Sequence, residues 1–209
     1  MSYITPPFII SMLVALTVHE CSHGLVAWWL GDPTAKNEGR LTLNPLAHLD
    51  LFGTLMFFFV GFGWAKPVPV DPRYSRHPKQ FMTLTALAGP ASNLLLAIVT
   101  VLIAKLILIL GISAGTGNEF FIELFSSMLF LNLGLMAFNL LPIAPLDGSK
   151  IVAMFIPAHL EPQYEDYLEK GPIILLFLLI GERMLNIPLI VGWISFILRP
   201  ILFALESIL

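Results

Sequence analysis

Long apolar runs separated by short polar connectors dominate this chain, and the pattern predicts membrane-spanning helices. A helix that crosses a bilayer needs about 20 mostly apolar residues. Residues 7–30, 81–110 and 120–141 each reach that length, and residues 187–205 are expected to form a further span. Residues 173–180 are apolar but too short to be assigned to the membrane or to its surface. The pattern therefore predicts an all-α polytopic membrane protein, a helical bundle with about three core spans and one or two further C-terminal spans.

The connector after the first run is expected to hold irregular elements. Residues 39–43 alternate polar and apolar positions, which suits either a small membrane-associated strand or an ordinary loop. Residues 51–62 are apolar but too short to span comfortably, and glycines interrupt them, so we expect a short re-entrant segment. Prolines then favour an extended path over residues 64–72. An extended edge in this region could pair with an extended peptide.

The later runs carry their own interruptions. Gly89 and Pro90 are expected to open the second long helix locally, although small residues there could instead permit close helix packing. A loop rich in Gly, Ser and Thr at residues 111–117 is expected to turn the chain on the outer side. Beyond the third run, residues 150–160 are expected to form an interfacial helix and residues 161–170 a solvated acidic loop.

Composition agrees with a membrane protein. Of 209 residues, 57% are hydrophobic and only 12% are charged, which excludes a soluble domain and leaves no sizeable extramembrane domain. No basic face suited to nucleic acid is visible, so no nucleic-acid partner is expected. The single cysteine excludes an internal disulfide. We expect residues 1–150 to form a catalytic membrane core and residues 151–209 to add C-terminal interfacial and transmembrane segments to the same domain.

Charged residues indicate which side of the membrane the connectors face. Between residues 64 and 80, basic residues outnumber acidic ones, and the positive-inside rule places such a loop in the cytoplasm. If the re-entrant segment returns to the side it left, residues 31–50 are cytoplasmic as well and the N-terminus lies outside. The expected location is the inner or plasma membrane. The residues counted are Lys66, Arg73, Arg76 and Lys79 against Asp71.

One motif inside the first apolar run carries the candidate chemistry. His19, Glu20 and His23 form the pattern HExxH. On a helix, positions four apart share one face, so both imidazoles can bind one zinc ion while Glu20 flanks a water on the metal. Each ionisable group at mid-membrane costs on the order of 3 kcal/mol, so such residues need a partner, a cavity or a metal. The alternative is a pair of buried histidines that bond to neighbouring helices.

A carboxylate after the third run is the candidate for the third protein ligand that such a metal site needs. The run ends in a break that contains Pro142 and Pro145, and Asp147 stands directly before Gly148. By the expected topology, Asp147 lies on the same side as the end of the first helix and could supply this ligand. From the residues alone, a plain loop carboxylate is an equal alternative.

Taken together, these motifs resemble those of the site-2 protease family of intramembrane zinc metalloproteases. The resemblance is to its short bacterial-type branch, which lacks an inserted PDZ or CBS domain. The one departure is Ala144, where the family often has proline, and it leaves every implied ligand in place. The matching motifs are HExxH and the stretches 39–45, 61–70, 88–93 and 138–148.

The resemblance implies a complete catalytic site. The implied zinc ligands are His19, His23 and Asp147, and the implied catalytic acid/base is Glu20. The implied function is hydrolysis of peptide bonds in transmembrane protein substrates, with Zn2+ as cofactor and with access from the cytoplasmic side. The alternatives are a divalent-metal transporter, which explains Glu20 poorly, and a catalytically silent membrane binding protein. The residues implied to contact the substrate strand are Asn93 and Asn139.

Overall fold

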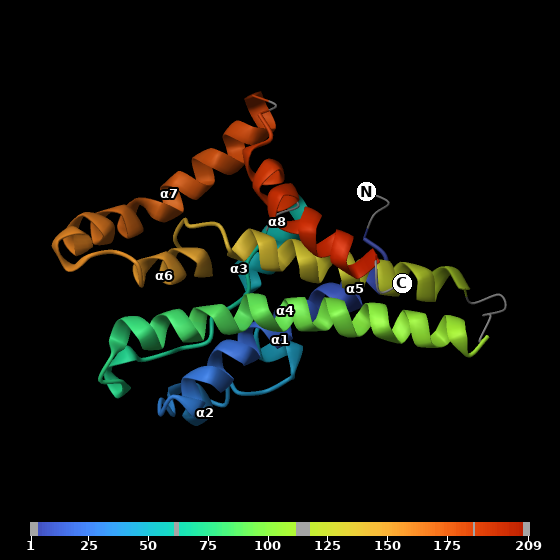
Figure 1. Ribbon diagram of the computed structural model, residues 1–209, viewed down its shortest axis with the longest axis horizontal. Helices are drawn as coiled ribbons and strands as arrows, with labels where there is room; N and C mark the ends of the chain where they lie inside the picture. The colour runs from blue at the N-terminus through green and yellow to red at the C-terminus, as the bar shows by residue number, and fades with distance from the viewer. Residues whose placement is uncertain (1–3, 61–62, 112–117, 186, 207–209) are drawn as a thin grey trace.

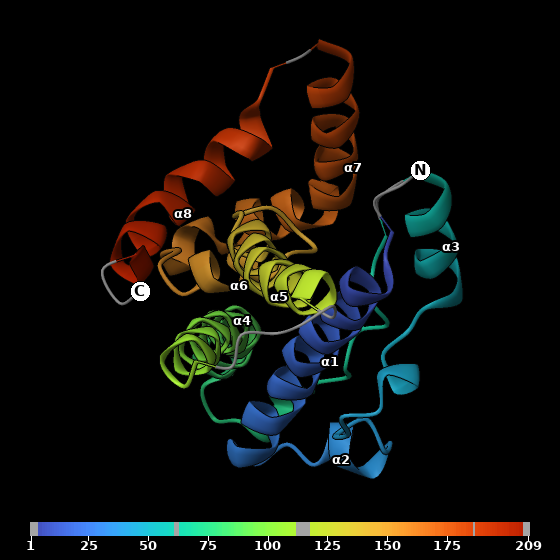
Figure 2. The same cartoon turned by 90° about the vertical axis from the view of Figure 1, so that its right-hand side faces the viewer.

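The centre of the molecule is formed by three long helices, α1 (Pro6–Trp29), α4 (Pro78–Ile109) and α5 (Asn118–Asn139). α4 and α5 lie side by side, and α1 crosses them obliquely (Figures 1 and 2). All three are long and apolar enough to cross a membrane, so the three predicted core helices are confirmed as helices of that kind. The computed structural model describes residues 4–60, 63–111, 118–185 and 187–206.

Five further helices surround this centre in the described residues, and these parts of the protein are all-α, as predicted. Short 3-10 turns cover Pro45–Ala47, Pro72–Tyr74 and Ala158–Leu160. The remaining α-helices are α2 (Thr34–Asn37), α3 (Leu51–Val60), α6 (Asp147–Ala153), α7 (Glu161–Leu185) and α8 (Leu189–Glu206).

The main core lies between α4, α5 and α8. Ala97 and Val101 of α4 meet Leu133 and Ala137 of α5, and none of the four is more than 3% exposed. Small residues allow helix backbones to approach closely in lipid, where packing rather than the hydrophobic effect drives helix association. Trp193 of α8 donates its indole N–H to the Ala137 carbonyl at 2.9 Å, which fixes α8 against α5.

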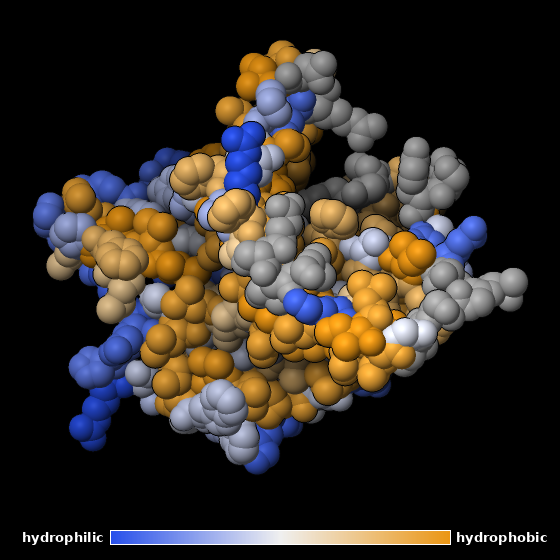
Figure 3. Space-filling model, turned by 45° about the vertical axis from the view of Figure 1, so that its right-hand side comes forward, coloured by the Kyte–Doolittle hydropathy of each residue, from blue (hydrophilic) through white to orange (hydrophobic). Residues whose placement is uncertain are grey.

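The outer faces of the bundle are apolar. Figure 3 shows hydrophobic side chains over most of one face, while hydrophilic ones gather towards its left edge. Leu106 of α4 is 55% exposed, and Phe130 of α5 is 61% exposed. A helix that is hydrophobic all round is either buried in protein or in contact with lipid. These exposed faces are therefore suited to the interior of a bilayer.

α4 runs without interruption through Pro90, so the expected local opening of the helix is wrong. A proline removes one backbone N–H, but neighbouring helices make this tolerable in membrane helices. The alternative prediction, that small residues here permit close helix packing, fits instead, because Gly89 and its small neighbours let α1 approach α4 closely. Of the expected outer loop at residues 111–117, all but Gly111 lies outside the described residues.

The connector after α1 forms no strand where one was considered. Residues 39–43 are turn, bend and irregular backbone, and the Thr42 carbonyl accepts a hydrogen bond from His48 Nε2 at 2.8 Å. The segment thus satisfies its polar groups within the connector. In the parts of the chain that the structure describes, β pairing is limited to an isolated antiparallel bridge between Leu49 and Ala65. The predicted small β element is reduced to this bridge.

The expected re-entrant segment is the short helix α3, and the chain on either side of it comes back together. A helix of 10 residues is about 15 Å long, half the thickness of a bilayer core. The bridge between Leu49 and Ala65 closes the excursion at its base. Gly53 permits this return, because a Cβ there would lie 2.1 Å from the Trp64 carbonyl oxygen. α3 consequently stands beside α1 at the edge of the bundle (Figure 2).

The C-terminal third contains more helix than predicted. The expected acidic loop at residues 161–170 is the first part of α7, and Glu161 begins that helix. Glutamate and lysine are good helix formers, and acidic residues suit a helix N-terminus, so this expectation was wrong. The expected interfacial helix at residues 150–160 is divided between α6 and a 3-10 turn. The expected last span at residues 187–205 forms the helix α8, but its apolar part, Leu189–Leu205, is shorter than the three helices that could cross a membrane, so this span stays a prediction.

Gly171 of α7 provides a test of how the C-terminal part packs on the core. A Cβ at Gly171 would lie 2.5 Å from Ala144 Cβ and 2.7 Å from its carbonyl oxygen. Gly171→Ala should therefore lower the free energy of unfolding by about 1–3 kcal/mol through overpacking. The measurement is the thermal midpoint of helix loss in detergent.

Gly181→Ala is the matched control in the same helix, because no described atom lies within 4 Å of a Cβ there. Alanine favours helix over glycine, so this variant should be neutral or stabilising. Equal midpoints for the two variants would contradict the packing of α7 on Ala144.

Candidate metal centre

The two histidines of α1 converge because α4 holds both rings from behind. Their ring centroids lie 4.7 Å apart. His19 Nδ1 lies 2.6 Å from Asn93 Oδ1, and His23 Nδ1 lies 2.7 Å from the Thr85 carbonyl oxygen. Both of these oxygens can only accept, so each imidazole carries its proton on Nδ1. In the neutral form of each ring, Nε2 then has the lone pair that can bind a metal.

Asp147 faces both lone pairs from the start of α6. Its Oδ2 lies 3.2 Å from His19 Nε2 and 3.3 Å from His23 Nε2. Oδ2 is buried and has no hydrogen-bond partner among the described residues. When both imidazoles are neutral and carry their protons on Nδ1, three electron-rich atoms meet with no proton between them. Such a cluster is repulsive in a low-dielectric interior unless a cation lies between its members.

The donor set fits a catalytic zinc ion. The ligand atoms of His19, His23 and Asp147 all lie within 4.8 Å of one another. Zinc binds imidazole nitrogen and carboxylate oxygen, and its catalytic sites use three protein ligands with a fourth position open. The orphaned Asp147 Oδ2 and the two aligned Nε2 atoms meet this requirement.

Glycines make the close approach of these elements possible. A Cβ at Gly89 of α4 would lie 2.5 Å from His19 Cε1 and 2.6 Å from His23 Cε1. A Cβ at Gly148 would lie 2.3 Å from the Leu141 carbonyl oxygen. Any larger residue at either position would push a ligand-bearing segment away from the site.

A fully buried pair of amides holds His19. Asn93 and Asn132 are both 0% exposed. Asn93 Nδ2 donates to Asn132 Oδ1 at 2.9 Å and to the Ala15 carbonyl at 3.1 Å, and these two acceptors fix the orientation of its amide. Asn132 Nδ2 donates in turn to the Met128 carbonyl at 2.7 Å. Asn93 therefore lies behind His19 with its side-chain polar atoms already bonded.

A cavity of about 120 Å³ lies beside the metal-binding atoms. Glu20 lines it, and its Oε2 accepts a hydrogen bond from the Val68 N–H at 2.9 Å. Asn139 of α5 also lines the cavity, whereas Asn93 does not line it. Of the two residues that the sequence implied to contact substrate, Asn139 thus lies on the cavity wall and Asn93 lies behind His19.

The segment that presents the Val68 N–H is fastened on both sides of that residue. Lys66 N–H donates to the His48 carbonyl at 2.8 Å. Asp71 N–H donates to Asp32 Oδ2 at 2.7 Å, and Asp32 is completely buried. This anchoring holds the Glu20 carboxylate in one orientation beside the ligands.

The structure brings together the residues that the sequence singled out, and it adds others. His19, His23 and Asp147 converge, and Glu20 lies on the same cavity. The sequence pattern did not single out Lys150 as a site residue. Its Nζ lies 3.7 Å from Asp147 Oδ1, and its side chain lines the cavity. Its position three residues after Asp147 on a helix was the available signal. The backbone groups that hold His23 and Glu20 leave no mark in a sequence.

Comparison with known proteins gives related sequences. Residues 105–179 match the profile described as Peptidase family M50. The chain is 40% identical over 179 residues to "Putative zinc metalloprotease YwhC" of Bacillus subtilis (strain 168), and the match covers 84% of this chain and 80% of that protein. No solved structure matches the chain at a significant level.

Mycobacterial relatives match as well. The chain is 32% identical over 190 residues to "Putative zinc metalloprotease Rip2" of Mycobacterium tuberculosis (strain ATCC 25618 / H37Rv), which covers 87% of this chain and 67% of that protein. The protein of the same name from Mycolicibacterium smegmatis is 31% identical over 144 residues, with 65% of this chain and 52% of that protein covered. This chain thus spans about half the length of the second of these relatives.

Asn93→Ala tests whether the buried amides hold the metal-binding imidazole. Loss of the acceptor for His19 Nδ1–H should weaken zinc binding roughly 10- to 100-fold, as is typical when a residue that orients a ligand is removed. The measurement is zinc affinity by competition with a chelator. Thr100→Ala is the matched control, because Thr100 is also buried on α4 but, among the described residues, its hydroxyl donates to the Leu96 carbonyl of its own helix and not to a metal-binding residue. An unchanged affinity in Asn93→Ala would contradict this role.

Gly89→Ala tests the fit of α4 against the imidazoles. The added methyl would collide with both rings, so purified Gly89→Ala should hold less zinc than wild type, by about tenfold at limiting zinc. Gly134→Ala on α5 is the control, since no described atom lies within 4 Å of a Cβ there. The account fails if Gly89→Ala binds zinc as tightly as Gly134→Ala.

Proposed function

Because this chain belongs to Peptidase family M50, the site-2 protease family of zinc metalloproteases, we propose that it hydrolyses peptide bonds within membrane-spanning segments of protein substrates. The observation that carries the proposal is the buried His19, His23 and Asp147 cluster, in which two ligands belong to a helix long and apolar enough to cross a membrane. A protease with its donor set at this depth would meet its substrates inside the bilayer.

We assign the metal to His19, His23 and Asp147. Zinc bound there would supply a Lewis acid that can polarise a carbonyl group and make water nucleophilic near neutral pH. The Nδ1–H bonds to Asn93 and to the Thr85 carbonyl keep both Nε2 atoms aimed at Asp147 Oδ2. The chain thereby supplies a site that needs no rearrangement to accept a cation.

Glu20 is assigned as the acid/base. The Val68 N–H holds Oε2 at 2.9 Å, and the carboxylate lies on the wall of the site cavity. Oε1 can therefore take the proton of the attacking water and later give it to the nitrogen of the departing peptide. The hydrogen bond from Val68 orients the carboxylate without occupying both of its oxygens.

A membrane-spanning substrate must unwind before it is cut, because its carbonyl groups are bonded within its own helix. The unwound backbone then needs partners. The anchored extended segment at residues 66–70 and the amide of Asn139 lie on the site cavity and could provide them. Since Asn93 is fully buried behind His19, we propose that it positions this ligand instead of contacting substrate.

The site is proposed to open to the cytoplasm of a bacterial-type cell membrane. Lys150 lines the site cavity, and Lys66 lies in the extended segment that covers it. Basic residues next to membrane spans are enriched on the cytoplasmic side. The proposed partners are a transmembrane protein substrate and the lipid bilayer, and no nucleic acid is involved.

Glu20→Gln separates catalysis from metal binding. The amide cannot take a proton from water, so cleavage of a model transmembrane substrate by the purified protein should fall roughly 10²- to 10⁴-fold. Zinc content should stay at the wild-type level, because Glu20 is not in the donor set. Glu119→Gln at the exposed start of α5 is the control and should cleave normally. Full cleavage by Glu20→Gln would refute the assignment of Glu20 as the acid/base, whereas zinc in both forms without cleavage by either would favour a transporter or a silent binding protein.

Metal removal tests the donor set directly. A chelator should abolish cleavage by the wild type, and added zinc should restore it, because the donors are already aligned. His23→Ala removes one of three protein ligands and should not regain activity at the zinc concentration that restores wild type. Cleavage by the chelator-treated, zinc-free wild type would contradict the proposal.

A further inference from the structure

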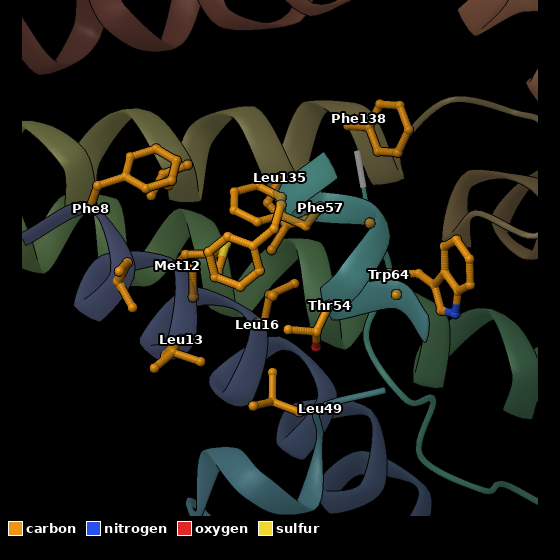
Figure 4. Close-up of a pocket in the computed structure, with 16 residues that line it drawn as sticks. Phe8, Met12, Leu13, Leu16, Leu49, Thr54, Phe57, Trp64, Leu135 and Phe138 are labelled. Carbon is orange, nitrogen blue, oxygen red and sulfur yellow. The ribbon is translucent and has the colours of Figure 1, made fainter. Parts of the chain in front are cut away.

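A second and larger cavity lies between α1, α3 and α5 (Figure 4). Its volume of about 440 Å³ falls within the roughly 300–1,000 Å³ range of ligand pockets. The hydroxyl of Thr54 lies on its wall but already donates to the Asp50 carbonyl at 2.6 Å. Most of the lining is apolar, including Phe8, Met12, Leu16, Phe57, Leu135 and Phe138.

The walls of this apolar cavity continue into the site cavity. On each of three segments, one residue lines the apolar cavity and the residue four positions later lines the site cavity. Residues four apart share one face of a helix, about one turn along, and also share one face of an extended segment. The two cavities are therefore neighbours along a common surface. The pairs are Leu16 with Glu20 on α1, Trp64 with Val68 on the extended segment, and Leu135 with Asn139 on α5.

α3 forms the outer wall of the apolar cavity. Phe57 turns towards α1 and stacks on Phe8, with ring centroids 6.3 Å apart. Phe59 is 83% exposed. A Cβ at Gly63 would lie 2.2 Å from the Gly53 carbonyl oxygen, so the returning chain is packed tightly onto α3. α3 thus forms one wall of the cavity, with Phe57 facing inward and Phe59 exposed on the outside.

We propose that this cavity is a substrate subsite that takes large apolar side chains next to the scissile bond of a membrane-spanning substrate. The inference rests on the proposed function, since it requires a peptide lying across Glu20. An unwound peptide at Glu20 places its neighbouring side chains one turn of α1 away, where Leu16 begins the apolar wall. Apolar side chains dominate membrane-spanning segments, and the chain offers them a shaped apolar surface at this point.

Shape is what such a subsite can recognise. In lipid, an apolar side chain gains little from leaving its surroundings, so selectivity comes from packing against the cavity wall. A lipid acyl chain has similar chemistry and could also enter. The three walls of the apolar cavity continue to the residues around Glu20, which favours a substrate side chain over a lipid acyl chain as the occupant. An acyl chain would need no access to the residues around Glu20.

Substrate preference provides the first test. Model substrates should differ only in carrying Leu, Phe or Ala at positions flanking the scissile bond. Wild type should cleave the Leu and Phe forms about tenfold or more faster than the Ala form. Met12→Trp fills the cavity two turns away from His19, so it should abolish or reverse this preference while zinc content is retained.

Leu106→Trp on the exposed face of α4 is the control and should keep the wild-type preference. The inference is overturned if Met12→Trp keeps that preference or slows the cleavage of every substrate equally.

Photo-cross-linking tests occupancy without relying on turnover. A photoreactive phenylalanine analogue replaces Phe57 in a Glu20→Gln background, where the substrate stays intact. The expected product is an adduct with the substrate close to the scissile bond, whereas the same analogue at Phe59 should label lipid. Lipid adducts alone from position 57 would overturn the subsite, while cleavage by wild type and not by Glu20→Gln would still support the proposed function. If wild type cleaves no substrate, the proposed function fails and the subsite fails with it.

Discussion

Everything in this fold depends on the meeting of three electron-rich atoms inside an apolar bundle. His19 Nε2 and His23 Nε2 both face Asp147 Oδ2, at 3.2 and 3.3 Å, with the imidazole protons on the far side of each ring. Without a cation this arrangement is costly in a low-dielectric interior. The structure nevertheless holds it in place through hydrogen bonds that α4 supplies. The three donor atoms thus converge on one point where a cation would be bound.

α4 is the element that makes this arrangement possible. It gives the Thr85 carbonyl and the Asn93 amide to the two imidazoles, and it has Gly89 where the rings approach. Small residues on the same helix face pack against α5, which carries Asn132 to support Asn93. α4 positions the metal ligands through its backbone and its small residues, so it must lie close to α1 and keep a regular shape. The helix continues without interruption through Pro90, which preserves that shape.

The sequence was informative where chemistry and periodicity coincide. The spacing of His19 and His23 predicted a shared helix face, and the position of Asp147 after the third apolar run placed it within reach. Long apolar runs likewise predicted α1, α4 and α5, because length and hydrophobicity alone define such helices.

Other features depend on tertiary contacts that leave no local pattern. The resemblance implied that Asn93 contacts the substrate strand, but its amide is buried by partners from two other helices. Residues 39–43 alternate like a strand, yet the nearby backbone pairs elsewhere, between Leu49 and Ala65. The acidic start of α7 looked like a loop because charge suggested solvent, although helix formation and solvation are compatible.

X-ray absorption at the zinc edge of the purified protein is the most direct test of the central claim. The account predicts zinc with two imidazole nitrogens and additional oxygen ligands at about 2.0–2.2 Å, and loss of one oxygen contribution in Asp147→Ala. A sulfur contribution at about 2.3 Å, or a spectrum unchanged by Asp147→Ala, would contradict the assignment of His19, His23 and Asp147 as the metal site.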